Sequence, residues 1–210
     1  MLFDFETLAA QDRYKLLTAS VLPRPIAWVV TQDLQGRNNA APFSFFNVFA
    51  QDPPLLVIGI GGRKPGDAKD TGNNIRETGQ FVVNLVSYET ADAMNITAID
   101  FPPEVDELAE AGLTTLPSVK IKPPRIAESP VAFECERLMT VELSSDRTLI
   151  MGKVLAMHVR DDCVSNAERC HLDTLKLDLV GRMHGGGGYL RANEMFDLPR
   201  IKPEDWERKT

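Results

Sequence analysis

A loop rich in glycine and lysine at residues 61–71, Gly-Gly-Arg-Lys-Pro-Gly-Asp-Ala-Lys-Asp-Thr, precedes a predicted helix. Glycines allow backbone N–H groups to approach an anion, and a helix N-terminus adds partial positive charge. Lys64 and Lys69 supply full charges and Thr71 a hydroxyl, all expected to be exposed, so these groups can hold a phosphate monoester. Asp70 is expected to cap the helix or to order the lysines. On spacing alone, a capped helix with solvated lysines is the commoner arrangement.

Aromatic and small polar residues gather where a predicted hairpin returns, at residues 40–47, Ala-Ala-Pro-Phe-Ser-Phe-Phe-Asn. Ser44 and Asn47 carry hydrogen-bonding groups that suit the polar edge of a flat heteroaromatic ligand, and the aromatic rings offer apolar faces. Because side chains alternate along a strand, Ser44 and Phe45 cannot both face one ligand unless the strand ends or bulges there. Core packing is the alternative for the phenylalanines.

A third cluster comprises Arg182, His184 and the four glycines 185–188. The glycines either admit a close ligand approach or form a mobile loop before Tyr189. A lone histidine such as His184 more often makes a local polar contact than takes part in catalysis. His158, His171 and His184 lack the spacing of metal ligands, so no metal site is predicted.

The order of these blocks resembles the FMN-binding split β-barrel family of flavin reductase-like proteins. The resemblance covers most of the chain, and the linked order is more specific than any single block. The matching segments are Arg24 to Val29, Pro42 to Asn47, Asp52 to Pro54, Lys69-Asp70-Thr71 with Asn74-Ile75, Phe81 to Asn84 and, loosely, Gly181-Arg182.

This resemblance implies a six-stranded split barrel, usually a homodimer, with the FMN phosphate at Lys69-Asp70-Thr71 and the flavin ring bordered by the strand of Ala27 and Trp28. A buried core tryptophan is an equal alternative for Trp28. Arg182 would lie where nicotinamide binds, although Met183 replaces the aromatic residue that often follows in the family. The predicted cofactor-binding residues are Arg24, Ala27, Trp28, Ser44, Phe45, Phe46, Asn47, Lys64, Lys69, Asp70, Thr71 and Asn74, with Arg182 and His184 on the donor side.

The chemistry implied is that of an FMN-dependent oxidoreductase. It would take hydride from NADH or NADPH and pass electrons to flavin, oxygen or a partner monooxygenase. No catalytic acid or base is predicted, because the cofactor itself carries the hydride. The alternative is an FMN-binding protein without reductase turnover, serving storage, sensing or electron shuttling. A pyridoxamine-phosphate-type oxidase would need a second basic cluster, and the sequence has none.

The elements that must position these residues are mostly strands, predicted at about 26–32, 39–46, 55–60, 81–86, 131–143, 148–159 and 175–180. Helices are predicted at 5–18, from Asp70 or Thr71 to Gly79, and at 103–111. This pattern predicts a mainly β fold, a β-barrel with helical additions, in a single domain over 1–210. Residues 87–130 interrupt the rhythm with six prolines. This excursion is either a functional lid or partner contact, or a solvent-exposed insertion.

Composition limits the class of protein further. The net charge is −7 with no basic stripe, which argues against a nucleic-acid partner. The N-terminus is acidic where a signal peptide is basic, and no apolar stretch approaches the ~20 residues of a membrane span, so we expect a cytoplasmic protein. Three unpatterned cysteines predict no disulfide framework, and Cys135 is expected in the core.

Overall fold

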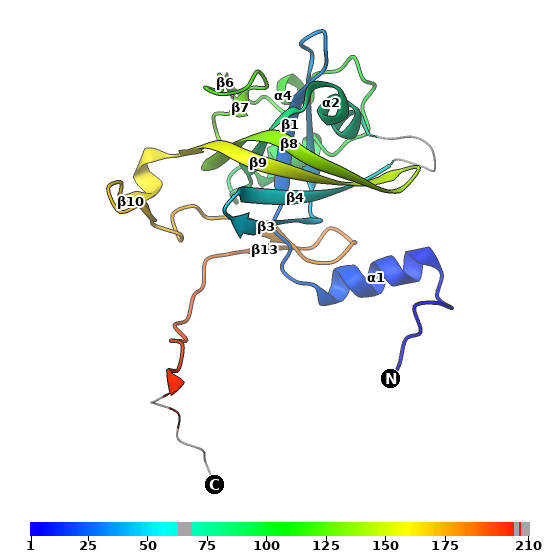
Figure 1. Ribbon diagram of the computed structural model, residues 1–210, viewed down its shortest axis with the longest axis vertical. Coiled ribbons are helices and arrows are strands. Elements are labelled where there is room, and N and C mark those ends of the chain that lie inside the picture. Colours follow the sequence, from blue (N-terminus) through cyan, green and yellow to red (C-terminus); the bar gives the residue numbers. More distant parts are fainter. Residues whose placement is uncertain (63–68, 204–205, 207–210) are drawn as a thin grey trace.

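One antiparallel sheet dominates the computed structural model, which describes residues 1–62, 69–203 and 206 (Figure 1). Its seven strands, within these residues, follow the order β2-β1-β5-β8-β9-β4-β3. Their bounds are β1 (Ala27–Gln32), β2 (Asn38–Phe43), β3 (Phe46–Gln51), β4 (Pro54–Gly61), β5 (Gln80–Leu85), β8 (Val131–Ser144) and β9 (Arg147–Val159).

The helices are short and lie around this sheet. They are α1 (Ala10–Ser20), α2 (Asp70–Thr78), α3 (Ala91–Ile96), α4 (Glu107–Glu110) and the 3-10 turn η1 (Asp161–Cys163). Three small antiparallel ribbons complete the described part: β6 (Thr115–Leu116) with β7 (Arg125–Ile126), β10 (Val164–Asn166) with β11 (His171–Leu172), and β12 (Val180–Arg182) with β13 (Tyr189–Arg191).

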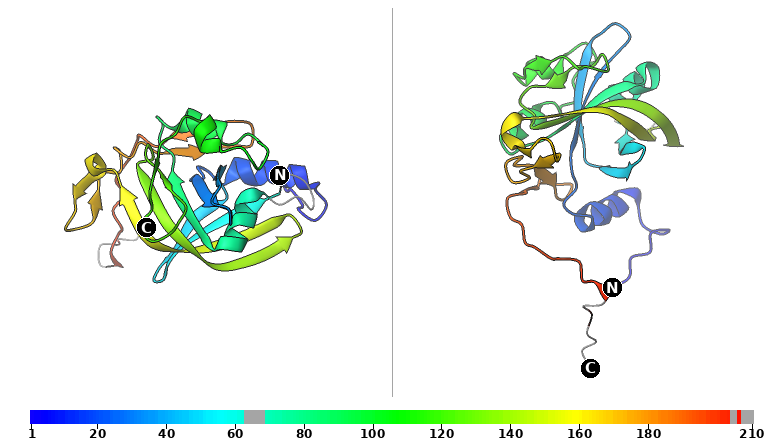
Figure 2. Two further views of the ribbon diagram at one scale, coloured as in Figure 1. Left: turned by 90° about the horizontal axis from the view of Figure 1, so that it is seen from above. Right: turned by 60° about the vertical axis from the view of Figure 1, so that its left-hand side comes forward.

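The sheet curves round because its two edge strands, β2 and β3, are consecutive in the chain and separated only by Ser44 and Phe45. The carbonyl of Phe45 accepts the amide of Gly59 in β4 at 2.7 Å. A Cβ at Gly59 would lie 3.0 Å from the Phe45 Cβ, so glycine allows this crossing. Seen from above, the strands enclose the core (Figure 2, left). The predicted β-barrel with helical additions is confirmed.

The barrel interior is filled by apolar side chains that alternate along the strands. Ala27, Val29, Ile58, Phe81 and Ile150 are all buried there. Gly152 of β9 makes room for the Phe81 ring, against which any Cβ would clash. Cys135 is buried in the same cluster, as predicted.

The excursion 87–130 covers the outer face of β1 and β5. Met94, Leu108 and Ile126 from this segment are buried against Trp28 and Val82. The reading of the excursion as a solvent-exposed insertion is therefore wrong. Both faces of β1 are buried, which explains its unbroken apolar run in the sequence.

Several predicted boundaries need correction. The first helix begins at Ala10 rather than residue 5, and the helix predicted at 103–111 is reduced to the single turn of α4. Residues 175–180 mostly form a turn, and the strand starts at Val180, because Asp178 has a positive φ of 49° that breaks an extended run. The return strand is split into β2 and β3, and α3 was not predicted.

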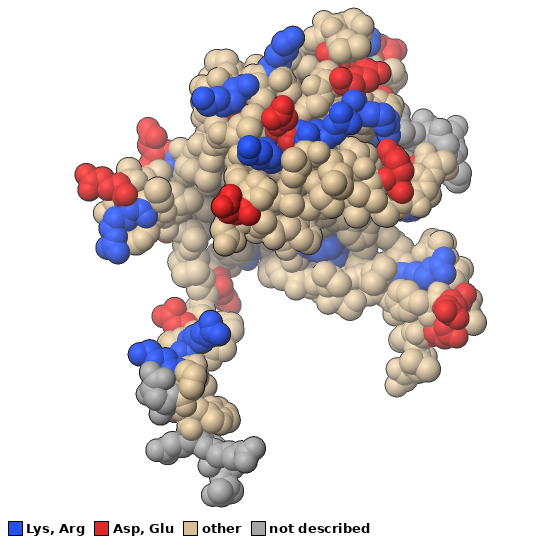
Figure 3. Space-filling view, in the orientation of Figure 1, with Lys and Arg blue, Asp and Glu red and all other residues tan. Residues whose placement is uncertain are grey.

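The C-terminal segment leaves the barrel after β13 and runs away from it (Figures 1 and 2). Its apolar side chains are largely exposed, including Met195, Phe196 and Leu198 at 67%, 87% and 85%. The face in Figure 3 mixes acidic and basic side chains around a wide uncharged area. Among the described residues, no helix is both long and apolar enough to cross a membrane.

Candidate functional site

A groove in two connected parts runs along the end of β2 towards the start of α2. Pro42 and Ala98 line both parts. The wider part holds about 230 Å³ and is lined by Tyr14, Ile26, Pro42, Phe43, Ser44, Met94, Asn95, Ala98, Arg182 and Tyr189. The narrower part holds about 50 Å³ and is lined by Asn39, Ala41, Pro42, Lys69, Asp70, Thr71, Thr97, Ala98, Ile99, Asp100 and Glu107.

Ser44 lies in the groove because β2 ends at Phe43. The break in the strand frees Ser44 and Phe45 from strict alternation, which is the condition the sequence set for Ser44 to face a ligand. The Phe45 ring packs instead against Tyr14 of α1, edge to face, with ring centroids 6.4 Å apart. Ser44 therefore lines the groove, whereas the Phe45 ring packs against helix α1 beside it.

Arg24 lies behind the groove and contacts Ser44, which lines it. Its guanidinium donates to the carbonyls of Thr18 at 2.7 Å and Val21 at 3.1 Å, and Nε reaches Ser44 Oγ at 3.5 Å. Burial lowers the pKa of Arg24 from its ordinary value, yet an arginine stays charged at neutral pH. Its backbone also pairs with Arg182. Arg24 thus links α1, Ser44 and the β12–β13 ribbon, and does not line the groove itself.

Arg182 closes one end of the wider part. It pairs in register with Tyr189 across the β12–β13 ribbon, and its guanidinium carbon lies 4.6 Å from the centre of the Tyr189 ring. The aromatic partner that the sequence lacked directly after Arg182 is therefore supplied by Tyr189. His184 lies in the turn, where its Nδ1 accepts the amide of Gly186 at 3.0 Å, a local contact.

The narrow end is formed by the start of α2. Lys69 precedes the helix, and its Nζ lies 5.9 Å from the Phe43 ring centre and 3.8 Å from Asp100 Oδ1. Asp70 is the first helical residue, and the N-cap residue is Lys69 with no side-chain capping hydrogen bond, so the expected cap at Asp70 or Thr71 is not formed. Thr71 is buried, not exposed as expected: its hydroxyl accepts from Asn39 Nδ2 at 3.1 Å.

Asn74, one turn further along α2, points to the barrel rather than into the groove. Its Nδ2 donates to Thr31 Oγ1 at 3.0 Å. The two amide–hydroxyl pairs, Asn39 with Thr71 and Asn74 with Thr31, fasten α2 to strands β2 and β1. They fix the position of the helix N-terminus relative to the barrel.

Glu107 of α4 brings a carboxyl group to the narrow end. Its Oε2 accepts the amide of Ala40 at 3.0 Å. Burial, and then the nearby charges of Asp106 and Asp70, raise the pKa of Glu107 above its ordinary value, against the opposing effect of the amide hydrogen bond. This shift is towards the neutral form of the carboxyl group.

The structure brings only part of the predicted set together. Ser44, Lys69, Asp70, Thr71 and Arg182 line the groove. Trp28 does not, since its side chain is 0% exposed and its indole donates to Thr97 at 2.9 Å, so the core alternative holds.

Four other predicted residues have side chains elsewhere, and one cannot be placed. Ala27 faces the barrel interior, and Phe46 packs against the same core because β3 starts there. Asn47 is exposed on β3, and its Oδ1 accepts the amide of Val48. Asn74 binds the barrel as described above. Lys64 lies outside the described residues.

The lining residues outside the predicted set include Tyr14, Asn39, Met94, Asn95, Ala98 and Tyr189. Tyr14 and Tyr189 reach the groove through tertiary packing of α1 and β13. Met94, Asn95 and Ala98 come from the excursion, whose prolines signalled irregular structure and not its position. Asn39 had a local signal, because it ends the polar turn before the aromatic run.

Comparisons with known proteins agree with this architecture. A family model for the flavin reductase like domain matches residues 19–173, and the chain belongs to that family. Its fold is the split barrel of flavin reductases, and the family implies an oxidoreductase.

Individual relatives are similar over nearly the whole chain. A Deinococcus radiodurans protein is 41% identical over 99% of this chain and 92% of its own length. Nitrilotriacetate monooxygenase component B from Bacillus cereus is 32% identical, with a TM-score of 0.88 over 94% of this chain and 98% of that one. The 2-nitrobenzoate 2-nitroreductase NbaA of Pseudomonas fluorescens is 33% identical, with a TM-score of 0.87 over 96% of each chain.

Proposed function

We propose that this protein is an FMN-dependent oxidoreductase of the NAD(P)H:flavin reductase type, which passes electrons to flavin or to a partner oxygenase. The observation that carries the proposal is the two-part groove, wide and aromatic at one end and narrow with Lys69 at the other. Family membership supports it, as does similarity to a protein named as a monooxygenase component.

The residues present fit FMN. The wider part offers apolar faces from Phe43, Met94 and Tyr14, with polar groups from Ser44 and Asn95 at the edges. These match a flat ring system that needs both kinds of contact. The narrow part offers the Lys69 ammonium, the N-terminus of the nine-residue helix α2, and Thr71. A helix N-terminus beside a lysine suits a phosphate monoester.

When bound, FMN would supply the hydride chemistry. The chain's own task is to hold and orient it. Ser44 is held by Arg24 at the ring end, and Lys69 neutralises charge at the phosphate end. Arg182 and Tyr189 line the wider part of the groove, whereas Lys69 lines the narrow part. They offer a positive group and an aromatic surface to an anionic nicotinamide dinucleotide. No side-chain acid or base is required.

An anaerobic experiment tests the proposal. The purified chain is saturated with FMN and mixed with NADH or NADPH, and the visible absorbance of oxidised flavin is followed. We expect bleaching with at least one donor. Bound flavin that neither donor bleaches would favour the binding protein without turnover. Failure to bind FMN at all would overturn both hypotheses.

Arg182→Met isolates the donor end of the groove. We expect flavin bound to this variant to be reduced at least tenfold more slowly, which corresponds to a barrier higher by about 1.4 kcal/mol, with unchanged FMN affinity. Arg191→Met is the matched control, because Arg191 lies on the same ribbon, stacks on Tyr88 and pairs with Asp178, away from the groove. Equal reduction rates in wild type and Arg182→Met would remove Arg182 from the donor site.

A further inference from the structure

A second cavity lies beside β8 and β9, away from the groove at β2 along the sheet, and shares no lining residue with it. It holds about 510 Å³ and is lined by Arg125, Ala127, Ser129, Ala132, Met157, His158, Val159, Arg160 and Asp161. In register, Pro42 of the groove pairs with Trp28, Trp28 with Asn84, Asn84 with Ala132, and Ala132 with His158. Four inter-strand steps of ~4.8 Å separate the sites by roughly 19 Å along the sheet.

Arg125 is the exceptional residue of this cavity. Its Nε is buried and has no hydrogen-bond partner. Within the part of the chain that the structure describes, its guanidinium forms no hydrogen bond or ion pair. A partly buried guanidinium without a counter-charge is unfavourable. An anion in the cavity would supply the missing acceptor, and an arginine fork suits carboxylate and phosphate oxygens.

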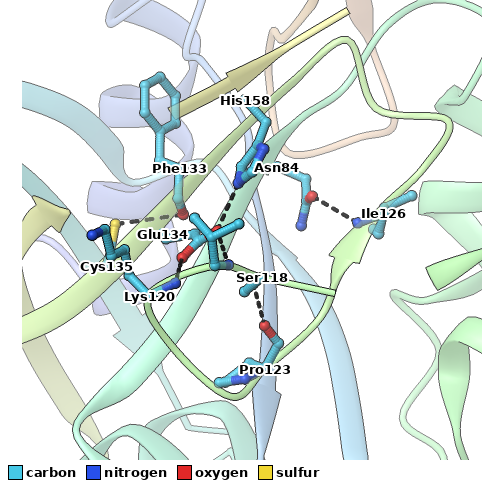
Figure 4. Close-up of polar contacts among 10 residues, drawn as sticks. Asn84, Ser118, Lys120, Pro123, Ile126, Phe133, Glu134, Cys135 and His158 are labelled. Atoms are coloured by element: carbon cyan, nitrogen blue, oxygen red, sulfur yellow. Dashed lines mark hydrogen bonds and ion pairs between the residues drawn. The ribbon is translucent and has the colours of Figure 1, made fainter. Parts of the chain in front are cut away.

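The backbone that carries Arg125 is fixed in place. The next residue, Ile126, is fully buried and donates its amide to Asn84 Oδ1 at 3.0 Å (Figure 4). Arg125 itself pairs with Leu116 in the β6–β7 ribbon. Its position is thus set before any ligand arrives, which reduces the ordering cost of binding.

The part of the lining that β9 supplies is also held by hydrogen bonds. His158 Nε2 lies 2.6 Å from Oε1 of Glu134, whose carboxylate also accepts the amides of Val119 and Lys120 (Figure 4). The Glu134 side chain is 0% exposed, so its charge is satisfied inside the protein and does not compete for the cavity. The His158 Nδ1 has no partner among the described residues and remains available to a ligand.

Arg160 completes the basic lining, with Asp161 as the one acidic residue there. The Arg160 guanidinium is held by Asp162 Oδ1 at 2.6 Å and by the Lys176 carbonyl at 3.3 Å. Of the two lining arginines, Arg125 is the one whose guanidinium has no direct partner among the described residues. The volume exceeds that of a bare anion and falls in the usual range for small-molecule sites.

We propose that this cavity binds a small molecule bearing a carboxylate or phosphate group. The Arg125 side chain would bind this anionic group, and His158 would make a second contact. The site is separate from the flavin groove and does not depend on the proposed function. The apolar patches from Met157, Ala127 and Ala132 would contact the body of such a ligand.

An NMR titration tests the site directly. The full chain, saturated with FMN so that the phosphate end of the groove is filled, is titrated with inorganic phosphate and separately with acetate. Sodium chloride keeps the ionic strength constant. We expect saturable shifts of the Arg125 Nε–H and of the backbone amides of Ile126 and His158 with at least one anion. The anion that saturates identifies the preferred group.

Three variants make the result decisive. Arg125→Gln should weaken binding at least tenfold, whereas Arg169→Gln, an exposed arginine outside the cavity lining, should leave it unchanged. Arg125→Lys keeps the charge without the fork and should bind between these two; it also serves if Arg125→Gln does not fold. Shifts that follow salt without saturating, or that persist in Arg125→Gln, would overturn the proposal.

Discussion

Lys69 and Thr71 are neighbours in the predicted phosphate site, but the structure gives them different roles. Lys69 is partly exposed and lies beside the Phe43 ring at the narrow end of the groove. Thr71 is buried, and its hydroxyl accepts a hydrogen bond from Asn39 that joins α2 to β2. Replacing both at once would therefore mix loss of a ligand contact with loss of a structural contact.

Replacement of Lys69 by Met separates the two. A charged hydrogen bond contributes about 1.5–3 kcal/mol, so we expect Lys69→Met to weaken FMN binding by roughly 10- to 100-fold. Quenching of FMN fluorescence on titration with protein measures the affinity. Folding stability should change little, because the ammonium group faces solvent and its one described ion pair, with Asp100, is exposed and 3.8 Å long.

The control for this prediction is Lys153→Met. Lys153 is an exposed lysine on β9, outside the groove lining, so its loss removes the same charge without touching the groove. If both variants bind FMN as wild type does, Lys69 is not a phosphate ligand. If both bind equally weakly, the effect is one of net charge, and the local assignment to Lys69 is lost.

Residue types near the groove were predictable where the signal was local. The Ser44 position followed from the aromatic run, and Arg182 from its glycine-rich surroundings. The side-chain directions of Trp28 and Ala27 were not predictable. An unbroken apolar run does not show which side chains face the barrel interior and which face another covering segment. An aromatic residue was expected directly after Arg182, and Tyr189 takes its place by pairing with Arg182 across the β12–β13 ribbon. Such a cross-strand pair cannot be seen from spacing in the sequence.

At the scale of elements, the excursion 87–130 is held on the sheet by buried polar side chains. Asn84 of β5 and Glu134 of β8 accept amides of Ile126, Val119 and Lys120. Glu134 faces away from the barrel interior that holds its neighbour Cys135, and the excursion buries this outer face. Its prolines indicated irregular structure, whereas docking depends on contacts distant in sequence.

The clamp formed by Glu134 predicts an acid-sensitive stability. Burial alone would raise the pKa of Glu134, yet the hydrogen bonds from His158, Val119 and Lys120 outweigh it and hold the pKa below its ordinary value. A folded-state pKa below the unfolded value stabilises the fold above the unfolded pKa of ~4.3, and this contribution is lost as pH falls through the folded pKa. Wild type should therefore lose this stability below about pH 4.

Glu134→Gln tests the clamp by urea unfolding at pH 7 and at lower pH values. We expect the variant to be less stable by about 1–3 kcal/mol at pH 7, with a difference that shrinks in acid. Hydrogen exchange of the Val119 and Lys120 amides should accelerate. Glu136→Gln, two residues along β8 and exposed, is the matched control and should do neither. A difference from wild type that stays constant with pH would contradict an ionised clamp.

For the whole molecule, the barrel was the most predictable feature, because alternation and turn residues set each strand locally. Six of the seven predicted strand segments became the seven strands of the large sheet, because the segment 39–46 is broken at Ser44 and Phe45. The course of the C-terminal segment was not predictable. Residues 192–203 run away from the barrel (Figure 1). Several of their apolar side chains are exposed, and a protein in water normally covers such groups.

A second copy of the chain is the covering that we propose, since the resemblance to flavin reductase-like proteins implies a homodimer. Each fully buried large apolar side chain contributes roughly 1.5–3 kcal/mol, so Met195, Phe196 and Leu198 together would add several kcal/mol to association. Removal of residues 193–210 should therefore weaken the dimer at least tenfold, as measured by sedimentation equilibrium. The triple variant Glu194→Gln, Asp197→Asn and Arg200→Gln keeps the apolar groups and should remain dimeric. A monomeric wild type, or a truncated chain that dimerises as tightly as wild type, would show that these side chains do not join two copies.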